Sequence, residues 1–441
     1  MTKEMNGVKS MNIFIAFFSA VYDPLNPYAI PCFYETFIQK LEDLGNNICV
    51  YVSKSFGAEF RKIPSQLLSD IKEFNPDLVI LFNNAFYDIS KEVECPILIY
   101  EVDSPLYYSN KEALKNNGDR YKFVVCQDES IETLISEFKI SPKNIIKVPF
   151  FTEIQPKKFP FSNNICFIGS RFFRGGISPY KKFIDTEPSQ EEKEQYYEIL
   201  KYLKKNPWIK KEDIIEIFSN VSVKVQSTFD LDKINCCLSD FNRRIVLSSI
   251  ADLGLDLYGD PYWEKDNYNE ADLIMSYKNK PIYSFKHNED VYNSCKIGIN
   301  INHRQAISGF SWRVCDIMAS NACLVSEYKS DIKKYFGNII PTFESPFEAR
   351  EICVKLLKDE VYRREIVEKS NEIINQKFRF NNVLPILEEF CGVPLRNNKE
   401  GYKTFILESE KRIKPIKLKY KIMKKIYDRL EKKLRRKGMV D

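Results

Sequence analysis

Residues 295–336 read CKIGININHRQAISGFSWRVCDIMASNACLVSEYKSDIKKYF, and this stretch decides the fold. Its pattern predicts a buried strand at 297–301, a small-residue loop around 308–309, a helix at 312–320 and a second buried strand at 322–325. Such a helix start can bind an anion, because it offers free N–H groups and the positive end of the helix dipole. An ordinary strand–helix–strand unit is an equal alternative, since short glycine motifs are weak signals.

Strands and helices alternate on both sides of this stretch. The first half predicts strands at 13–18, 48–52, 78–82, 97–100, 123–126 and 145–148, with helices at 34–44, 66–74 and 130–138. The second half predicts strands at 164–168 and 255–258 and helices at 242–253, 288–294, 346–357 and 361–375. Because these strands are apolar on both faces, we expect two parallel sheets with helices on each side, the doubly wound α/β architecture.

The predicted fold class is α/β, with two Rossmann-like domains at 11–155 and 160–392 that face each other across a cleft. A charged helical segment at about 174–240 interrupts the second domain as an insertion. A lid, an acceptor platform, a dimer contact and a plain solvated insert are all compatible with it. Residues 400–441 are predicted to form a basic amphipathic tail. Ligands of such sheets bind beyond the carboxyl ends of the strands, so the loops after residues 168, 258 and 301 should line the cleft.

Composition limits the possible classes of protein. With 441 residues, of which 44% are hydrophobic and 29% charged, the chain is globular and long enough for two cores. Its 12 cysteines include no Cys-x-x-Cys pair, and only two histidines accompany them. We therefore expect reduced, buried cysteines in a cytoplasmic protein, and no metal site. No apolar run reaches the length of a membrane span.

Charge is distributed unevenly along the chain. From residue 411 onward there are 14 basic and 3 acidic side chains, whereas the rest of the chain has 52 basic and 58 acidic ones. A mildly acidic body argues against a nucleic-acid partner. The basic tail has apolar residues at helical spacing, which predicts peripheral contact with an anionic membrane at the inner face of the plasma membrane. A solvated helix docked on the acidic body is the alternative.

Six short blocks carry a family resemblance. They are YEVDSP at 100–105, FIGS at 167–170, LYG at 257–259, GININH at 298–303, GFSWR at 309–313 and LVSE at 324–327. As a set, the blocks resemble the CgeB-like glycosyltransferases over most of residues 11–391. The resemblance implies a GT-B fold with a group 1-like C-terminal domain. It also implies transfer of a sugar from a nucleotide-sugar donor to a surface-glycan or lipid-linked acceptor. Two departures are an Asp316 where the family helix has Glu, and an Asn321 where it usually stops at Gly.

The resemblance implies a donor site at the carboxyl ends of the second domain's strands. The donor-binding candidates are Gly169, Ser170, Arg171, Tyr258, Gly259, His303, Ser308, Gly309, Ser311 and Asp316. The glycines and serines would donate hydrogen bonds to the diphosphate, Tyr258 would face the base, and Asp316 would bind the ribose. His303 would bind the sugar or a phosphate. Arg313, together with Arg171, would stabilise the departing phosphate in place of a metal.

A transfer with inversion also needs a general base from the first domain, near the acceptor hydroxyl. Asp103 is the best placed candidate because it follows a predicted strand, and Glu101 is a weaker one. Asp103 and Arg313 are therefore the catalytic candidates. Each role has a structural alternative: an Asx turn for Asp103, a helix-dipole contact for Asp316, a core position for His303 or Tyr258, and a solvated loop for Arg171.

Two other functions stay open at the level of the sequence. A non-catalytic GT-B scaffold would bind a partner through the insertion, and the aspartate at position 316 is compatible with it. A sugar-nucleotide epimerase has the same two-domain fold, but it needs more acids and histidines around the cleft than this chain supplies. A Rossmann dehydrogenase is not expected, because no Gly-x-Gly-x-x-Gly follows the strands at 13–18 or 164–168.

Overall fold

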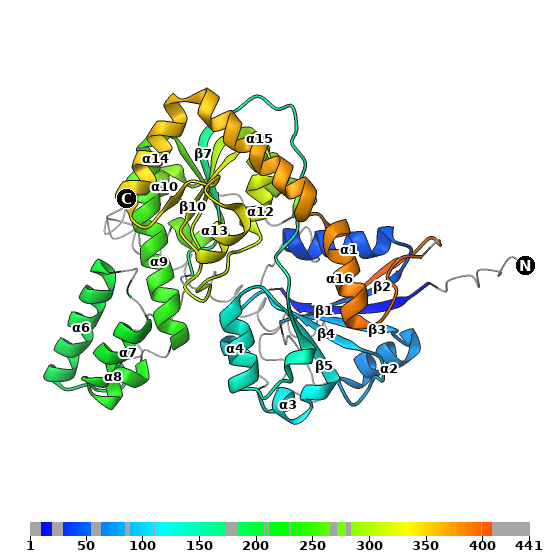
Figure 1. The fold of residues 1–441 in the computed structure, drawn as a ribbon. Helices are drawn as coiled ribbons and strands as arrows, with labels where there is room; N and C mark the ends of the chain where they lie inside the picture. Colours follow the sequence, from blue (N-terminus) through cyan, green and yellow to red (C-terminus); the bar gives the residue numbers. More distant parts are fainter. Residues whose placement is uncertain are drawn as a thin grey trace, which may run out of the picture.

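The computed structural model describes residues 10–19, 30–53, 63–83, 89–108, 111–172, 183–206, 209, 211–228, 231–264, 271–278, 284–397 and 399–407. These residues form two parallel sheets, each covered by helices (Figure 1). The predicted α/β class is therefore confirmed, and the first sheet lies in the lower right of the view with the second above it.

The first sheet has seven strands in the order β12-β2-β1-β3-β4-β5-β6, all paired in parallel. The strands are β1 (Asn12–Phe18), β2 (Asn47–Ser53), β3 (Leu78–Phe82), β4 (Ile97–Tyr100), β5 (Tyr121–Val125), β6 (Ile145–Lys147) and β12 (Lys403–Leu407). The helices that connect them are α1 (Cys32–Asp43), α2 (Ser65–Phe74), α3 (Lys111–Asn116) and α4 (Asp128–Ser136). Ile13 and Phe14 fall in two separate apolar clusters, so the two faces of β1 are both buried, as its sequence predicts.

The second sheet has five parallel strands in the order β11-β10-β9-β7-β8. They are β7 (Asn163–Ile168), β8 (Leu255–Tyr258), β9 (Cys295–Asn300), β10 (Cys323–Glu327) and β11 (Thr342–Phe343). Around them lie α9 (Leu231–Ile250), α10 (Ala271–Ser276), α11 (Phe285–Ser294), α12 (Arg313–Met318), α13 (Ser330–Phe336), α14 (Pro346–Lys358) and α15 (Glu360–Lys377). The sheet grows on both sides of its first strand, β7, which is the doubly wound arrangement.

The helical insertion is visible as a separate group of helices beside α9 (Figure 1). It comprises α6 (Gln190–Lys205), α7 (Lys211–Ser219) and α8 (Val223–Thr228), and it has its own apolar cluster around Tyr196 and Leu238. The helix expected at 242–253 already begins at Leu231, so part of the predicted insertion is the start of α9. Residues 174–182 of the predicted insertion lie outside the described part of the chain.

The C-terminal part of the chain crosses back to the first sheet. The ring of Phe380, at the start of α16 (Phe380–Cys391), lies 5.9 Å from that of Phe37 in α1. Strand β12 then pairs with β2, so residues 403–407 belong to the first sheet and not to the tail expected from residue 400. The sequence prediction missed this strand because β12 is short, half-exposed and next to a lysine-rich run. The basic run 411–441 lies outside the described residues.

The two sheets share one apolar core. Trp312, just before α12, stacks on Phe33 of α1 at a centroid distance of 5.9 Å. The Trp312 ring also meets Phe150, which lies between β6 and β7, edge-on at 5.9 Å. Aromatic pairs of this kind add about 0.5–1.5 kcal/mol beyond the area that they bury. Trp312 therefore holds the start of α12 against the first domain.

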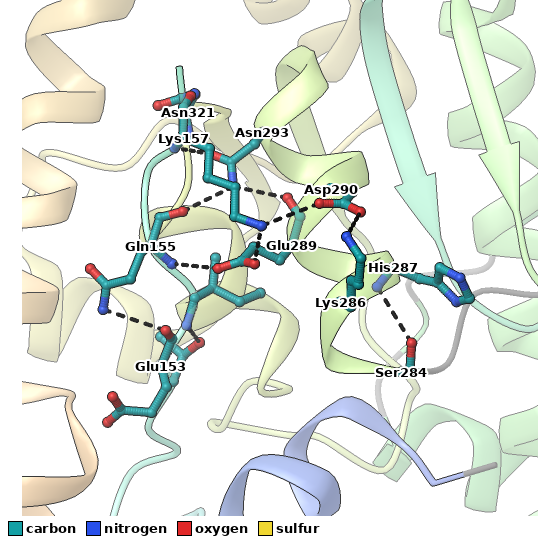
Figure 2. Close-up of polar contacts among 12 residues, drawn as sticks. Glu153, Gln155, Lys157, Ser284, Lys286, His287, Glu289, Asp290, Asn293 and Asn321 are labelled. Carbon is teal, nitrogen blue, oxygen red and sulfur yellow. Dashed lines mark hydrogen bonds and ion pairs between the residues drawn. The ribbon is translucent and has the colours of Figure 1, made fainter. Parts of the chain in front are cut away.

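The linker between the sheets is bound along α11. Figure 2 shows Lys157 between the carboxylates of Glu289 and Asp290, with both of which it forms ion pairs. The Gln155 N–H donates to Glu289 at 3.2 Å, and the Asn293 side-chain amide donates to the Gln155 carbonyl at 2.9 Å. These bonds fix the linker along α11, so the linker is an ordered part of the second domain's surface.

An ion pair also joins the two domains near the end of β6. The Lys147 ammonium lies 2.8 Å from the Asp331 carboxylate of α13 and 2.9 Å from Asp128 of α4. The side chains of Lys147 and Asp331 are 11% and 2% exposed. Removing one member of a buried pair leaves an uncompensated charge, which is more costly than losing the pair as a whole.

We expect Lys147→Met to lower the free energy of unfolding by about 3 kcal/mol, because the Asp331 carboxylate stays buried without its cation. Urea denaturation measures the change. The double variant Lys147→Met/Asp331→Leu should recover most of the loss. Lys72→Met is the control: its ion pair with Glu92 is exposed, and we expect a change within about 0.5 kcal/mol. Equal losses in Lys147→Met and the control would contradict the role of the buried pair.

Candidate active site

A hollow lies between the domains where the strands of both sheets end. Its lining from the first domain is Glu101, Val102, Ser104, Cys126, Gln127 and Phe150, and from the second Asn302, His303, Gln305, Ala306, Gly309, Phe310, Ser311 and Trp312. The second-domain wall is thus the loop between β9 and α12. The loops after residues 168 and 258 do not contribute to this lining.

Arg313, the first residue of α12, reaches back to the ends of two strands. Its Nε donates to the Ile168 carbonyl at 2.8 Å, and its Nη1 donates to Asn300 Oδ1 at 3.0 Å. The guanidinium also lies 5.3 Å from the centre of the Phe167 ring. Burial lowers the pKa of Arg313, but guanidinium groups remain protonated in proteins. Arg313 is therefore a fixed cation between β7 and β9.

Arg243 of α9 is a second cation beside these strand ends; it is buried, and the sequence analysis did not include it in the site. Its Nη2 donates to the Ile301 carbonyl at 3.0 Å, and its Nη1 donates to the Ser170 carbonyl. The guanidinium lies 4.2 Å from the centre of the Phe172 ring. Burial and the charge of Arg313 hold its pKa well below the usual range. The signal that could have revealed it is an arginine on the buried side of a predicted helix.

Gly169 and Gly259 let the loops after β7 and β8 touch each other. A Cβ atom on Gly259, whose φ is 154°, would lie 2.1 Å from the Gly169 carbonyl oxygen, so this position requires glycine. The same carbonyl accepts a hydrogen bond from Trp263 Nε1 at 2.9 Å. The Ser170 carbonyl accepts a hydrogen bond from Arg243. Both glycines have a demonstrable packing role, and donation to a diphosphate stays a prediction for them and for Ser170.

Arg171 is an internal residue of the second domain. It is 2% exposed, its Nε donates to Asp240 Oδ1 at 2.8 Å, and its Nη1 donates to the Tyr262 carbonyl at 3.1 Å. Its backbone N–H donates to Asp260. The structure thus places Arg171 in an ion pair that joins the loop after β7 to α9, and not in a solvated loop.

Tyr258 and His303 each form a hydrogen bond with a residue two positions away in the chain. The Tyr258 hydroxyl donates to Asp256, two residues earlier, at 3.5 Å. His303 Nδ1 accepts from the Gln305 N–H at 3.2 Å, which leaves Nε2 as the donor nitrogen in the neutral ring. Nε2 lies 3.8 Å from the Cys236 sulfur. His303 lines the hollow and Tyr258 does not.

The loop residues Ser308 and Gly309 contact the first domain. Ser308 Oγ donates to Glu129 of α4 at 2.5 Å. A Cβ atom on Gly309 would lie 3.0 Å from the Cys126 carbonyl oxygen. Gly309 therefore permits a close backbone approach, as expected, but the nearby group is first-domain backbone. Ser311 Oγ donates to Asn300 at 3.2 Å and lies at the hollow.

Asp103 is exposed and lies at the rim of the hollow, between two residues that line it. Its Oδ2 accepts from Asn83 Nδ2 at 3.0 Å, and its Oδ1 accepts from Gln305 Nε2 at 2.6 Å. Asn83 follows β3 in a left-handed conformation, with a φ of 59°. Two side-chain amides, one from each domain, therefore orient the carboxylate.

Glu101, by contrast, is a buried acid in the wall of the hollow, 3% exposed. Burial raises its pKa to about 8, even though hydrogen bonds from Ser130 Oγ at 2.5 Å and the Cys126 N–H at 3.0 Å oppose the shift. At neutral pH Glu101 thus carries a proton, while Asp103 at the rim is exposed to water.

Asp316 faces the linker and does not line the hollow. Its Oδ1 accepts from Thr152 Oγ1 at 2.7 Å, and the residue is 3% exposed. Burial raises its pKa to about 7, whereas the bond from Thr152, the nearby Cys32 and the charge of Arg313 lower it. In this arrangement Asp316 lies within the domain interface, and the ribose contact stays a prediction.

The Asp316 pKa predicts a pH-dependent stability. Because its folded value of about 7 exceeds the ordinary 3.8, the native state binds a proton that the unfolded state releases as the pH rises from about 4 to 7. Its contribution is fully present below pH 4 and is lost through pH 7, by about 4 kcal/mol. Asp316→Asn should flatten this part of the curve of unfolding free energy against pH.

Denaturant unfolding at pH 4.5, 6 and 7.5 measures that curve. Asp119→Asn, at an exposed position, is the matched control and should keep the wild-type slope. A wild-type slope in Asp316→Asn would show that Asp316 does not titrate as we infer.

The cysteines agree with the expectation from composition, because all 12 are free and most are buried. Within the described ranges, no three or more His, Cys, Asp and Glu side chains are grouped so that they could hold a metal ion. Among the described helices, none combines the length and the apolar composition that crossing a membrane requires.

Comparisons with known proteins agree with this geometry. Residues 243–388 match the model of a family described as glycosyl transferase-like. No curated protein matches the chain. Sucrose-phosphate synthase from Thermosynechococcus elongatus is similar in structure, with a TM-score of 0.51 and 9% identity over 85% of this chain and 97% of that one. HepE from Anabaena, in complex with UDP and glucose, has a TM-score of 0.51 and 12% identity over 86% and 99%.

The chain therefore has the GT-B glycosyltransferase fold, as the sequence resemblance implied. Its second domain contains a glycosyl transferase-like region from Arg243 to Glu388, which includes β8, β9 and α12. At identities this low, structural similarity establishes the fold alone. The family match and the fold together point to a transferase.

Proposed function

We propose that this protein is a CgeB-like glycosyltransferase that moves a sugar from a nucleotide-sugar to a surface-glycan or lipid-linked acceptor. One observation carries the proposal: in a GT-B fold, the hollow between the domains is lined by chain neighbours of both candidates. Asp103 lies between the lining residues Val102 and Ser104, and Arg313 follows the lining residue Trp312. The region after residue 160 would bind the donor, and the region up to residue 155 would bind the acceptor. The UDP and glucose bound to HepE make a UDP-sugar the first donor to test.

Arg313 would stabilise the leaving group. As the bond between the sugar's anomeric carbon and the phosphate oxygen breaks, the diphosphate takes both electrons and gains negative charge. A cation already fixed by Ile168 and Asn300 needs no reorganisation at that moment. Arg243 strengthens the positive potential from behind the β7 and β9 ends. Under this proposal no metal is required.

Asp103 would act as the general base for an inverting transfer. The acceptor hydroxyl gives its proton to the carboxylate while its oxygen forms the new bond to the anomeric carbon. Asp103 suits this task because it is exposed at the rim of the hollow, whereas Glu101 is protonated at neutral pH. Glu101 would therefore stay neutral within the wall and not compete for the proton.

Ligand-dependent melting tests the donor site. We expect one class among UDP-, GDP-, CMP- and ADP-sugars to stabilise the wild type by about 2.7 kcal/mol at 100 times its dissociation constant. Arg313→Ala should lose this stabilisation, and Arg313→Lys should retain part of it. Arg350→Ala is the control, because Arg350 also binds an acid and a carbonyl, Asp252 and Ser249, but its chain neighbours do not line the hollow, whereas a neighbour of Arg313 does.

Each outcome has a definite meaning. A shift in the wild type and the control, but not in Arg313→Ala, supports the donor site. Release of free sugar from the same donor by the wild type would support a transferase over a scaffold. No shift with any nucleotide-sugar, and no release, would contradict the proposal and favour the scaffold. If Arg313→Ala already melts far below the wild type without ligand, Arg313→Lys takes its place.

The basic run 411–441 would bring the enzyme to an anionic membrane surface, where a lipid-linked acceptor lies. We expect the full chain to sediment with vesicles of phosphatidylcholine and phosphatidylglycerol (3:1) at 50 mM salt, and to be released at 500 mM salt. Vesicles of phosphatidylcholine alone should not bind it. Replacing Lys424, Lys425, Lys432 and Lys433 by Gln should weaken sedimentation at least several-fold. Unchanged sedimentation of that variant would contradict the role of the tail.

A further inference from the structure

Gln305, in the loop after β9, binds two groups of the first domain at once. Its Nε2 donates to Asp103 Oδ1 at 2.6 Å, and its Oε1 accepts from the Ser104 N–H at 3.2 Å. A side-chain amide can do this because it carries a donor and an acceptor at the same end. The loop that bears Gln305 is therefore joined directly to the end of β4.

Gln127 makes the same kind of contact in the opposite direction. It follows β5 in the first domain and is 5% exposed. Its Nε2 donates to the Gln305 carbonyl at 3.1 Å, and its Oε1 accepts from the Ile307 N–H at 2.9 Å. The two glutamine side chains thus make four hydrogen bonds across the cleft, and each binds backbone or carboxylate groups of the other domain.

We propose that Gln305 and Gln127 form a reciprocal clamp that closes the cleft, and that Gln305 is a positioning residue for Asp103. The second part rests on the proposed function, in which Asp103 is the base. A clamp made of neutral amides suits a cleft that must open, because each such bond contributes only modestly to stability. By contrast, the Lys147–Asp331 pair, which lies elsewhere in the interface, joins two charges.

The clamp couples the orientation of the base to the closed cleft. In the closed arrangement Asn83 holds Oδ2 of Asp103 and Gln305 holds Oδ1. Each carboxylate oxygen still has a further acceptor position for the proton of an incoming hydroxyl. When the cleft opens, the bond from Gln305 is lost and the carboxylate is held only by Asn83. Asp103 is then aligned for reaction only while both domains are in place.

Several titratable groups surround Asp103. Besides Gln305, its titratable neighbours are Glu101 on the same segment, Tyr34 of α1, Tyr108 and, through Gln305, His303. Burial raises the pKa of Glu101 and of both phenols. Those three groups are therefore neutral in mildly acidic solution. The carboxylate that Gln305→Glu introduces would therefore be the charge nearest to Asp103.

The test uses the full-length protein and four variants. They are Gln305→Ala, Gln305→Glu, the double variant Asp103→Asn/Gln305→Glu, and the control Gln376→Ala, an exposed glutamine that bonds only along its own helix. Small-angle scattering of the unliganded protein reports closure. Steady-state transfer with the donor identified by melting reports kcat, KM and their dependence on pH.

We expect Gln305→Ala to lower kcat by about 10- to 100-fold with little change in the donor KM, and to increase the radius of gyration. Gln305→Glu should also move the acidic limb of the kcat profile to higher pH, because two adjoining carboxylates share a proton. The double variant exchanges the amide and the acid between the two positions. It should regain the wild-type radius of gyration, because the bond between the domains is restored, yet remain inactive.

Wild-type kcat and pH profile in both single variants would overturn the positioning role. A wild-type radius of gyration in Gln305→Ala would overturn the clamp. A shift of the pH profile in Gln305→Ala as large as in Gln305→Glu would attribute the effect to structure alone, and would also overturn the positioning role. If the wild type transfers no sugar, the proposed function fails and the positioning role with it, whereas the scattering comparison still decides the clamp.

Discussion

The arrangement of the cleft depends on the insertion of one indole, Trp312, into the aromatic cluster of the first domain. Its stacking on Phe33 and its edge contact with Phe150 fix the point where the loop after β9 becomes α12. The next residue is Arg313, so the same anchor determines where the cation lies. The preceding loop must then run along the first domain, which brings Gln305 to Asp103. Aromatic rings serve well as such an anchor, because their contacts are extensive and only two side-chain torsions need to be fixed.

Charge is arranged in opposite senses on the two sides of the cleft. The second domain contributes Arg313, which is half-buried, and Arg243, which is buried. Both guanidinium groups lie beside the Phe167 ring. The first domain contributes the carboxyl groups of Asp103 and Glu101. Burial disfavours charge on both sides, and the protonation of Glu101 removes one negative charge that would otherwise lie next to Asp103, the proposed base. Of these groups, Asp103 remains as an exposed carboxylate on one side, with fixed cations on the other. The proposed transfer, which loses a proton on one side and releases an anion on the other, requires this polarity.

The strands were predictable because each is a short run of apolar residues on both faces, and the structure confirms all ten that were expected. The sequence analysis missed β12 and α16, since they join a sheet formed more than 300 residues earlier in the chain. Candidate site residues were harder to place. Arg171, in a Gly-Ser-Arg loop, resembles a phosphate ligand, but Asp240 from α9 neutralises it. Ser308 has the chemistry of a donor, and its hydroxyl is directed to Glu129 of the other domain.

By itself the sequence determined the α/β class, the two parallel sheets, the carboxyl edge where the candidate site lies and the presence of a charged insertion. These features follow from periodicity and from short motifs, which are local properties of the chain. Only the tertiary structure decided which polar groups face the cleft. Gln127 and Gln305 carry no local signal, and they become partners because β5 and the loop after β9 end at the same place. Hydrogen bonds between residues so far apart in the chain depend on how the two domains pack, and no local pattern encodes that packing.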